Sequence, residues 1–209
     1  MDTATDSHRI TDAGTLEKLY GLPSGASVEK EVDYLHPHYQ RLIAASPFFV
    51  LATSGPGGMD ASPRGDAPGF VAVQDEKTLL IPDRRGNNRA DSLKNIIADP
   101  RVALLFLIPG VGETLRVNGR AEIRTDPALL ERFGVEGKLP RSVIVVRVET
   151  CFFQCARAIF RSKLWDPARQ VERKSLPSLG TIVADITGAK FDGKKYDEGL
   201  YERLKGSLY

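Results

Sequence analysis

Cysteine and histidine are scarce in this sequence of 209 residues, which contains only Cys151, Cys155 and the three histidines His8, His36 and His38. Two cysteines cannot form a disulfide framework, and we expect both to be reduced thiols that are buried as small hydrophobic side chains. Their C-x-x-x-C spacing differs from the redox motif C-x-x-C. Because the histidines lie far from the cysteines in the sequence, no zinc site with four clustered ligands is expected.

Long apolar runs and a strong excess of one charge are also missing. No run of about 18 apolar residues exists, so no membrane span is expected. The net charge is +2, from 29 basic and 27 acidic residues, which argues against a general nucleic-acid-binding protein. The first ten residues, MDTATDSHRI, lack the apolar core of a secretory signal, and we therefore expect a cytoplasmic protein.

Familiar catalytic and nucleotide-binding motifs are absent too. The sequence has neither the phosphate loop G-x-x-x-x-G-K-[ST] nor a G-x-G-x-x-G motif that follows a strand. It shows no evident pairing of a nucleophile with a base, and no paired catalytic carboxylates. This inventory favours a protein that binds a phosphorylated planar cofactor and leaves the reaction to the cofactor.

What the sequence does contain is a series of short apolar or alternating segments, typical of β-strands. Residues 114–123 alternate most clearly, with Leu115, Val117, Ala121 and Ile123 on one face. The six predicted strands are 48–53, 59–73, 78–82, 102–108, 114–123 and 143–148. Because most of them are joined by tight turns, we expect an antiparallel, mainly β fold with peripheral helices, predicted at 89–98, 126–133 and 196–206.

The stretch 81-IPDRRGNNRADSLKNI-96 places Arg84, Arg85 and Arg89 where a helix is predicted to begin. A helix N-terminus carries partial positive charge and free N–H groups, so three arginines there are unfavourable unless an anion lies among them. A phosphate or a carboxylate would suit this place. The alternative is that Arg84 and Arg85 pair with Asp83 or Asp91 on the surface.

The same helix carries its own start and stop signals. Asn88 is a suitable N-cap, and Asp91 could bond back to it as in a capping box. Leu93, Ile96 and Ile97 are spaced to share one apolar face. Pro100 follows, and predicts a helix end near residue 99.

Two further candidates lie on predicted strands. Arg64 belongs to 62-SPRGD-66, where glycine in a strand marks a bulge or a close ligand, although an edge strand with a turn is an equal alternative. Thr114 and Arg116 lie on the polar face of the alternating strand. That face either lines a pocket, where both side chains would donate hydrogen bonds, or faces solvent, which is more common.

The only tryptophan, Trp165, lies beside Arg161 and Ser162 in 160-FRSKLWDP-167. An aromatic ring beside cations suits stacking on a planar anionic ligand. The alternative, and the more common case, is a tryptophan that anchors packing.

Taken in order, the runs SPRGD-x-PGFV, LLIPDRRGNNRADSLKNI, ETLRVNGRAEI and CARAIFRSKLWDP resemble the pyridoxamine 5′-phosphate oxidase-like flavoproteins, and more narrowly a bacterial subgroup of FMN-dependent enzymes of the oxidase class. The resemblance covers about residues 35–170. It implies an antiparallel split β-barrel that forms a homodimer, with FMN at the subunit interface. The implied organisation is an N-terminal helical extension (1–34), an FMN-binding split-barrel domain (35–170) and a C-terminal extension (171–209) that packs on the barrel or the dimer partner.

The resemblance also implies an activity and a cofactor site. The activity would be that of an FMN-dependent oxidoreductase, which passes electrons from a small organic molecule or reduced nicotinamide to oxygen or another acceptor. The alternative is a carrier or sensor that holds flavin, haem or deazaflavin without turnover. The implied FMN-binding residues are Arg64, Gly65, Asp66, Ile81, Pro82, Asp83, Asn87, Asn88, Arg89, Ser92, Thr114, Arg116, Arg161, Ser162 and Trp165.

Two departures from the family pattern limit the activity that the resemblance implies. The segment after Asp166 does not match the substrate-phosphate site of the oxidase itself, so oxidation of pyridoxamine phosphate is not expected. Gln154-Cys155 stands where the subgroup has a His-Cys pair.

Overall fold

The structure is a computed structural model that describes residues 8–209, so residues 1–7 of the predicted N-terminal extension lie outside the described residues. The chain divides into two compact units, residues 1–31 and 32–209. The described part of the first unit contains helices α1 (Ala13–Tyr20) and α2 (Ala26–Glu29), neither of which has a buried residue. Asp12 caps α1, because its Oδ1 accepts a hydrogen bond from the backbone N–H of Thr15 at 2.9 Å.

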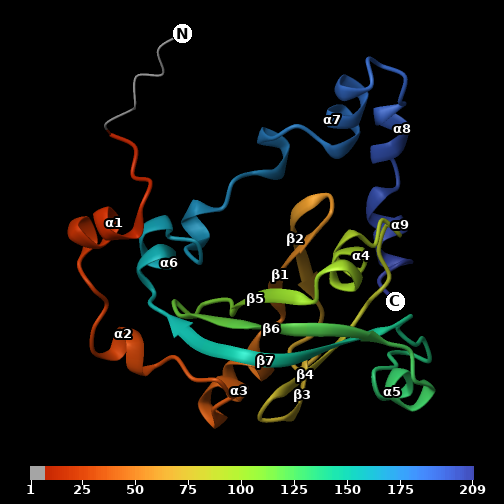
Figure 1. Cartoon of the computed structure of the whole chain (residues 1–209). Coiled ribbons are helices and arrows are strands. Elements are labelled where there is room, and N and C mark those ends of the chain that lie inside the picture. The colour runs from red at the N-terminus through yellow and green to blue at the C-terminus, as the bar shows by residue number, and fades with distance from the viewer. Residues whose placement is uncertain (1–7) are drawn as a thin grey trace. The chain divides into compact units, whose positions relative to one another are not determined.

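The second unit is built on one antiparallel sheet (Figure 1). The order of its strands is β2-β1-β5-β6-β7-β4-β3, and every neighbouring pair is antiparallel. The strands are β1 (Phe48–Gly55), β2 (Gly58–Gly65), β3 (Ala72–Asp75), β4 (Thr78–Pro82), β5 (Arg101–Leu107), β6 (Thr114–Arg124) and β7 (Val143–Gln154). This sheet and its peripheral helices fit the predicted mainly β, split-barrel fold.

The described residues form seven strands where the sequence predicts six, because the segment 59–73 divides in two. Residues 66–71, between β2 and β3, include Pro68 and Gly69, and Gly69 has a φ of 87°, a left-handed conformation that breaks the strand. Strand β7 also runs six residues beyond the predicted end at 148. A register shift between Asn118 and Gly119 accommodates this long pairing with β6.

The core lies on the apolar faces of the central strands. Leu115 and Val117 of β6 are buried, as the alternation predicts, and Ile123 packs against the core while partly exposed. The rings of Phe49 on β1 and Phe106 on β5 lie 5.1 Å apart between centroids, and both are buried. Full burial of such side chains stabilises the fold by about 1.5–3 kcal/mol each, which fixes the register of the sheet.

The helices of this unit are α3 (Pro37–Ala45), α4 (Asp91–Ala98), α5 (Pro127–Arg132), α6 (Arg157–Ser162), α7 (Leu179–Ile186), α8 (Gly193–Asp197) and α9 (Leu200–Lys205), with 3₁₀ turns at Pro167–Arg169 and Arg173–Ser175. Helices α3 and α4 of this unit pack on the sheet, whereas α7 and α8 pack on each other away from it (Figure 1). The final helix predicted at 196–206 is confirmed only over α9, because residues 196 and 197 belong to α8. Gly199, with a φ of 69°, separates α8 from α9.

Prolines lie at the boundaries of two of these helices. Pro37 opens α3, while Val32 lies outside the helix and pairs with Cys151 in an isolated bridge. Helix α4 ends at Ala98, before Pro100. No helix within residues 8–209 is both long enough and apolar enough to cross a membrane.

Candidate functional site

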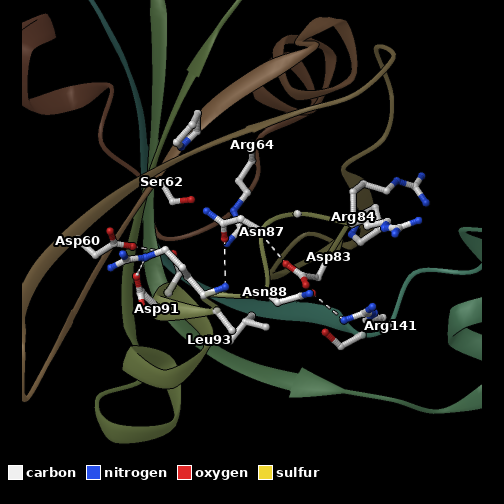
Figure 2. Close-up of a pocket in the computed structure, with 18 of the residues that line it drawn as sticks. Asp60, Ser62, Arg64, Asp83, Arg84, Asn87, Asn88, Asp91, Leu93 and Arg141 are labelled. Atoms are coloured by element: carbon white, nitrogen blue, oxygen red, sulfur yellow. Dashed lines mark hydrogen bonds and ion pairs between the residues drawn. The ribbon is translucent and has the colours of Figure 1, made fainter. Parts of the chain in front are cut away.

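A pocket of about 630 Å³ lies where β2, the loop after β4, the start of α4 and the loop before β7 meet (Figure 2). This volume is within the range of about 300–1,000 Å³ that is typical of small-molecule sites. The pocket is lined by the arginines Arg64, Arg84, Arg85, Arg89 and Arg141, which come from three separate segments of the chain. The arginine cluster in the sequence therefore lines a concave site, in which Asp60, Asp83 and Asp91 offset part of the positive charge.

Strand β2 forms one wall of the pocket. Side chains of a strand alternate between its two faces, and Asp60, Ser62 and Arg64 are the half-buried members of β2 and all line the pocket. β2 is an edge strand of the sheet, which tolerates Pro63. Both interpretations of this segment fit the structure. The segment is an edge strand, and it places Arg64 at a cavity of ligand size.

Arg64 is held by an ion pair and has one buried nitrogen without a hydrogen-bond partner among the described residues. Its Nη1 lies 2.5 Å from Oδ1 of Asp83, and the two side chains are 20% and 17% exposed. Its Nε is buried and has no hydrogen-bond partner among the described residues. A buried donor without a partner costs about 1–3 kcal/mol, but an atom without exposed surface offers no direct contact to a ligand in the open pocket.

The loop 83–90 forms the opposite wall, and its conformation corrects the predicted capping box. Asn88 and Ala90 are left-handed, with φ values of 61° and 54°, and no side chain caps the N-terminus of α4. Asn88 Oδ1 instead accepts from Arg141 Nη1 at 2.9 Å, and Asp91 accepts from Arg89. The first N–H groups of α4 are thus left without a capping side chain at the edge of the pocket.

The buried face of α4 also differs from the predicted one. Ile96 is 3% exposed but Ile97 is 79% exposed, so the prediction for Ile97 is wrong. Ser92 takes its place, because the residue is 3% exposed and its hydroxyl donates to Asp60 Oδ2 at 2.7 Å. Ser92 and Ile96 are four residues apart and share a face, and the serine fixes the helix to strand β2.

Arg84 and Arg85 do not form the surface pairs with Asp83 or Asp91 that the sequence offered as an alternative. Arg84 pairs with Asp66 at 2.7 Å and donates to the carbonyl of Phe133, also at 2.7 Å. Arg89 pairs with Asp91 at 2.7 Å, but its side chain is 75% exposed, so this pair is worth about 0–1 kcal/mol. Arg85 makes no ion pair within residues 8–209.

Asp66 supports Arg84 from behind the pocket. Its side chain is 6% exposed, and its Oδ1 accepts from the hydroxyl of Tyr209 and from the backbone N–H of Ala67. Burial alone would raise the pKa of Asp66, but the hydrogen bonds from Tyr209, Ala67 and Arg84 outweigh burial and lower it. The carboxylate is therefore ionised at neutral pH and offsets the charge of Arg84.

Eight of the predicted cofactor residues line this one pocket. They are Arg64, Gly65, Pro82, Asp83, Asn87, Asn88, Arg89 and Ser92. Of the others, Asp66 lies behind it and Ile81 is a core residue, 1% exposed.

Five predicted residues do not line the pocket, namely Thr114, Arg116, Arg161, Ser162 and Trp165. The Thr114 hydroxyl lies 3.5 Å from Oε1 of Gln154, and the Arg116 guanidinium lies 5.3 Å from the centroid of the Phe152 ring. The Trp165 Nε1 donates to the carbonyl of Val111 at 2.8 Å, as expected of a tryptophan that anchors packing. Within one chain, these residues and the pocket are separate.

Sequence reasoning missed Asp60, Ser62, Arg141 and Ser142, which also line the pocket. The first two could have been found, because they alternate with Arg64 along one strand face. Arg141 is 53 residues from its partner Asn88, and only the pairing of β4 with β7 brings the two together.

The two cysteines differ in environment, which corrects the prediction that both are buried. Cys151 is buried, and burial raises the pKa of its thiol to about 12, whereas Cys155 is exposed. Among residues 8–209, no group of three or more histidine, cysteine, aspartate or glutamate side chains could hold a metal ion.

Comparison with known proteins identifies the family. The sequence model described as pyridoxamine 5′-phosphate oxidase matches residues 35–155, more than half of the chain. The chain belongs to the pyridoxamine 5′-phosphate oxidase family. The matched residues include the whole of β1 to β7 and every residue that lines the pocket.

Solved structures similar to this family member include three from bacteria. HupZ from Group A Streptococcus is 20% identical over 57% of this chain and 94% of its own, with a TM-score of 0.47. A Lactobacillus delbrueckii protein provisionally named a pyridoxamine 5′-phosphate oxidase is 21% identical over 58% of this chain and 95% of its own, with a TM-score of 0.45. An FMN-binding protein from Syntrophomonas wolfei is 14% identical over 55% of this chain and 82% of its own, with a TM-score of 0.43. No curated protein matches this sequence.

Proposed function

We propose that this protein binds FMN in the pocket beside β2 and acts as an FMN-dependent oxidoreductase on a small molecule. The observation that carries the proposal is a pocket of ligand size in which five arginines meet the uncapped start of α4. Membership of the pyridoxamine 5′-phosphate oxidase family supports the same cofactor.

The FMN phosphate would be held by Arg64, Arg89 and the loop with Asn87 and Asn88. A phosphate monoester carries a charge of about −1.5 to −2 at neutral pH, and each charge-assisted hydrogen bond contributes about 1.5–3 kcal/mol. Arg89 can exchange its exposed pair with Asp91 for the phosphate at little cost. The uncapped N–H groups of α4 add to the attraction.

FMN would supply the electron and hydride transfer chemistry, and the residues of this chain would bind and orient it. Arg64 and Ser92 are fixed by Asp83 and Asp60, so one wall of the site is set before the ligand binds. We assign no side chain of the pocket as a general acid or base.

The five predicted residues outside the pocket suggest how the site is completed. We expect Thr114, Arg116, Arg161, Ser162 and Trp165 to approach the cofactor from the second subunit of a homodimer, with FMN at the interface. Their separation from the pocket within one chain supports this arrangement, because a cofactor at an interface takes its contacts from both subunits.

The donor set of the pocket favours flavin over haem for the binding-module alternative. Haem iron is held by histidine, cysteine, methionine or tyrosine side chains, and none of these lines the pocket within the described residues. A flavin carrier without turnover stays the second candidate.

The test begins with the absorbance spectrum of the purified protein and mass spectrometry of any released ligand. We expect a flavin spectrum, and we expect NADPH, NADH or a member of a panel of small organic molecules to reduce the bound flavin, with reoxidation by oxygen. Protein that stays colourless after incubation with FMN would refute the proposal. Flavin binding without reduction across the panel would leave only the carrier function.

A further inference from the structure

A second, smaller cavity of about 90 Å³ adjoins the cofactor pocket. Arg84, Arg85 and Arg141 line both cavities, whereas Lys138 and Tyr209 line only the smaller one. In Figure 2, Arg84 and Arg141 lie together on the side of the larger pocket that is remote from Asp60. The small cavity therefore lies behind the loop wall of the cofactor pocket, not behind β2.

The small cavity carries a surplus of positive charge. Four cationic side chains line it and no aspartate or glutamate does. Asp66 offsets the charge of Arg84, but Arg85 and Lys138 make no ion pair within residues 8–209. Arg141 donates only to the neutral amide oxygen of Asn88. Cations without counter-ions around one small space favour an anion in it.

The shape of this cavity is fixed by contacts that Tyr209 makes. Its ring centroid lies 5.3 Å from the guanidinium carbon of Arg84, and its hydroxyl donates to Asp66 Oδ1 at 2.7 Å. Arg84 is held further by Asp66 Oδ2 and the Phe133 carbonyl, and its side chain is only 16% exposed. Arg84 and Tyr209 are thus set in place, while Arg85 and Lys138 remain exposed and available to a ligand.

We infer that this cavity is a second anion subsite, which holds the carboxylate or phosphate group of a small anionic substrate while FMN occupies the larger pocket. Its volume is far below the range of about 300–1,000 Å³ for whole ligands, so it suits one charged group and not a complete molecule. The three shared arginines would set that group beside the cofactor. The assignment to substrate rests on the proposed FMN-dependent activity, whereas the anion site itself stands on its own residues.

Calorimetric titration of the FMN-saturated protein tests the subsite. The probes are inorganic phosphate and benzoate, with uncharged benzamide as the control ligand. Saturation with FMN keeps both anions from its phosphate seat, and the flavin spectrum reports throughout whether FMN is retained. We compare Lys138→Glu, which changes a residue of the small cavity alone, with Arg120→Glu on β6, outside both cavities.

We expect at least one anion to bind with a stoichiometry of one per chain and benzamide not to bind. Lys138→Glu should weaken that anion about tenfold or more, since it removes a charge-assisted contact and adds repulsion, and Arg120→Glu should change it less than threefold. Which anion binds more tightly decides between a phosphate and a carboxylate. Absence of binding by both anions, or equal affinity in the two variants, would overturn the subsite.

Retention of FMN is measured separately from binding of the anion. Retention of FMN in Lys138→Glu together with loss of the anion supports a subsite distinct from the cofactor pocket. If the protein does not bind FMN but still binds the anion in a way that depends on Lys138, the subsite holds and the FMN-dependent function fails.

Discussion

The two walls of the proposed cofactor pocket are stabilised in different ways. On β2, the regular pleat and the pairing with β1 place Asp60, Ser62 and Arg64 on one face, and buried partners fix two of them. The loop 83–90 has no such ladder, and it includes two left-handed residues and the exposed Arg89. The difference teaches that a hydrogen-bonded strand can fix the position of a ligand, while an exposed loop supplies charge that interacts with it.

The largest effects should follow from removing arginines on the two walls. We expect Arg64→Ala to weaken FMN binding about 100-fold, because it removes a cation from the wall of the pocket and leaves Asp83 unpaired beside the phosphate. Arg89→Ala should weaken FMN binding about tenfold, because an exposed side chain contributes less to the binding free energy. Fluorescence titration of FMN measures both.

Arg85→Ala and Arg120→Ala are the matched controls for these two variants. Arg85 lines the pocket but belongs to the second subsite in our proposal, and Arg120 lies outside both cavities. Each should change FMN affinity less than Arg89→Ala does. Equal retention of flavin in the Arg89 and Arg85 variants would mean that the phosphate seat is wrongly placed.

A smaller effect is expected from Asp66, which holds Arg84 of the loop wall by an ion pair. Asp66→Asn should lower the free energy of unfolding by about 1–3 kcal/mol at neutral pH, because it weakens the pairing with Arg84 and the bond from Tyr209. The pKa of Asp66 is lowered in the folded state, so its contribution is present above the unfolded pKa of about 3.9 and disappears as the pH falls through the folded value.

Urea denaturation at several pH values measures this dependence, with Asp75→Asn as the control at an exposed carboxylate. The difference between Asp66→Asn and the unchanged protein should be greatest near neutral pH and vanish in acid. A difference that stays constant down to pH values well below about 3.9 would show that the carboxylate charge of Asp66 is not what holds Arg84.

The same contrast explains how far the sequence alone could go. Both β4 and β6 were predictable from local patterns. β6 alternates with a period of two, whereas β4 is a short apolar run, and its predicted bounds 78–82 agree with the structure. The cluster of arginines also marked the pocket, because repulsion at a helix start signals an anion. These inferences needed only neighbours in the chain.

The features that the sequence did not predict depend on contacts between residues far apart in the chain. Arg141 reaches Asn88 because β7 pairs with β4, and no local pattern announces that meeting. The capping box failed because Asn88 is left-handed and its side chain serves Arg141 instead of the helix. Asn is one of the few residues that adopt this conformation readily, so its presence in Gly-Asn-Asn was compatible with either role.

The smallest predicted effect is a gain in stability on the loop wall. Ala90 has a φ of 54°, where an L-residue with a Cβ is strained and glycine is not. Ala90→Gly should therefore raise the free energy of unfolding by about 0.5–1 kcal/mol, since relief of the strain outweighs the greater freedom that glycine gives the unfolded chain. Ala98→Gly, in the last turn of α4, should instead lower it by up to about 1 kcal/mol. If both glycine variants lose stability equally in thermal unfolding, the left-handed loop is not a strained wall, and the contrast between the two sides of the pocket weakens accordingly.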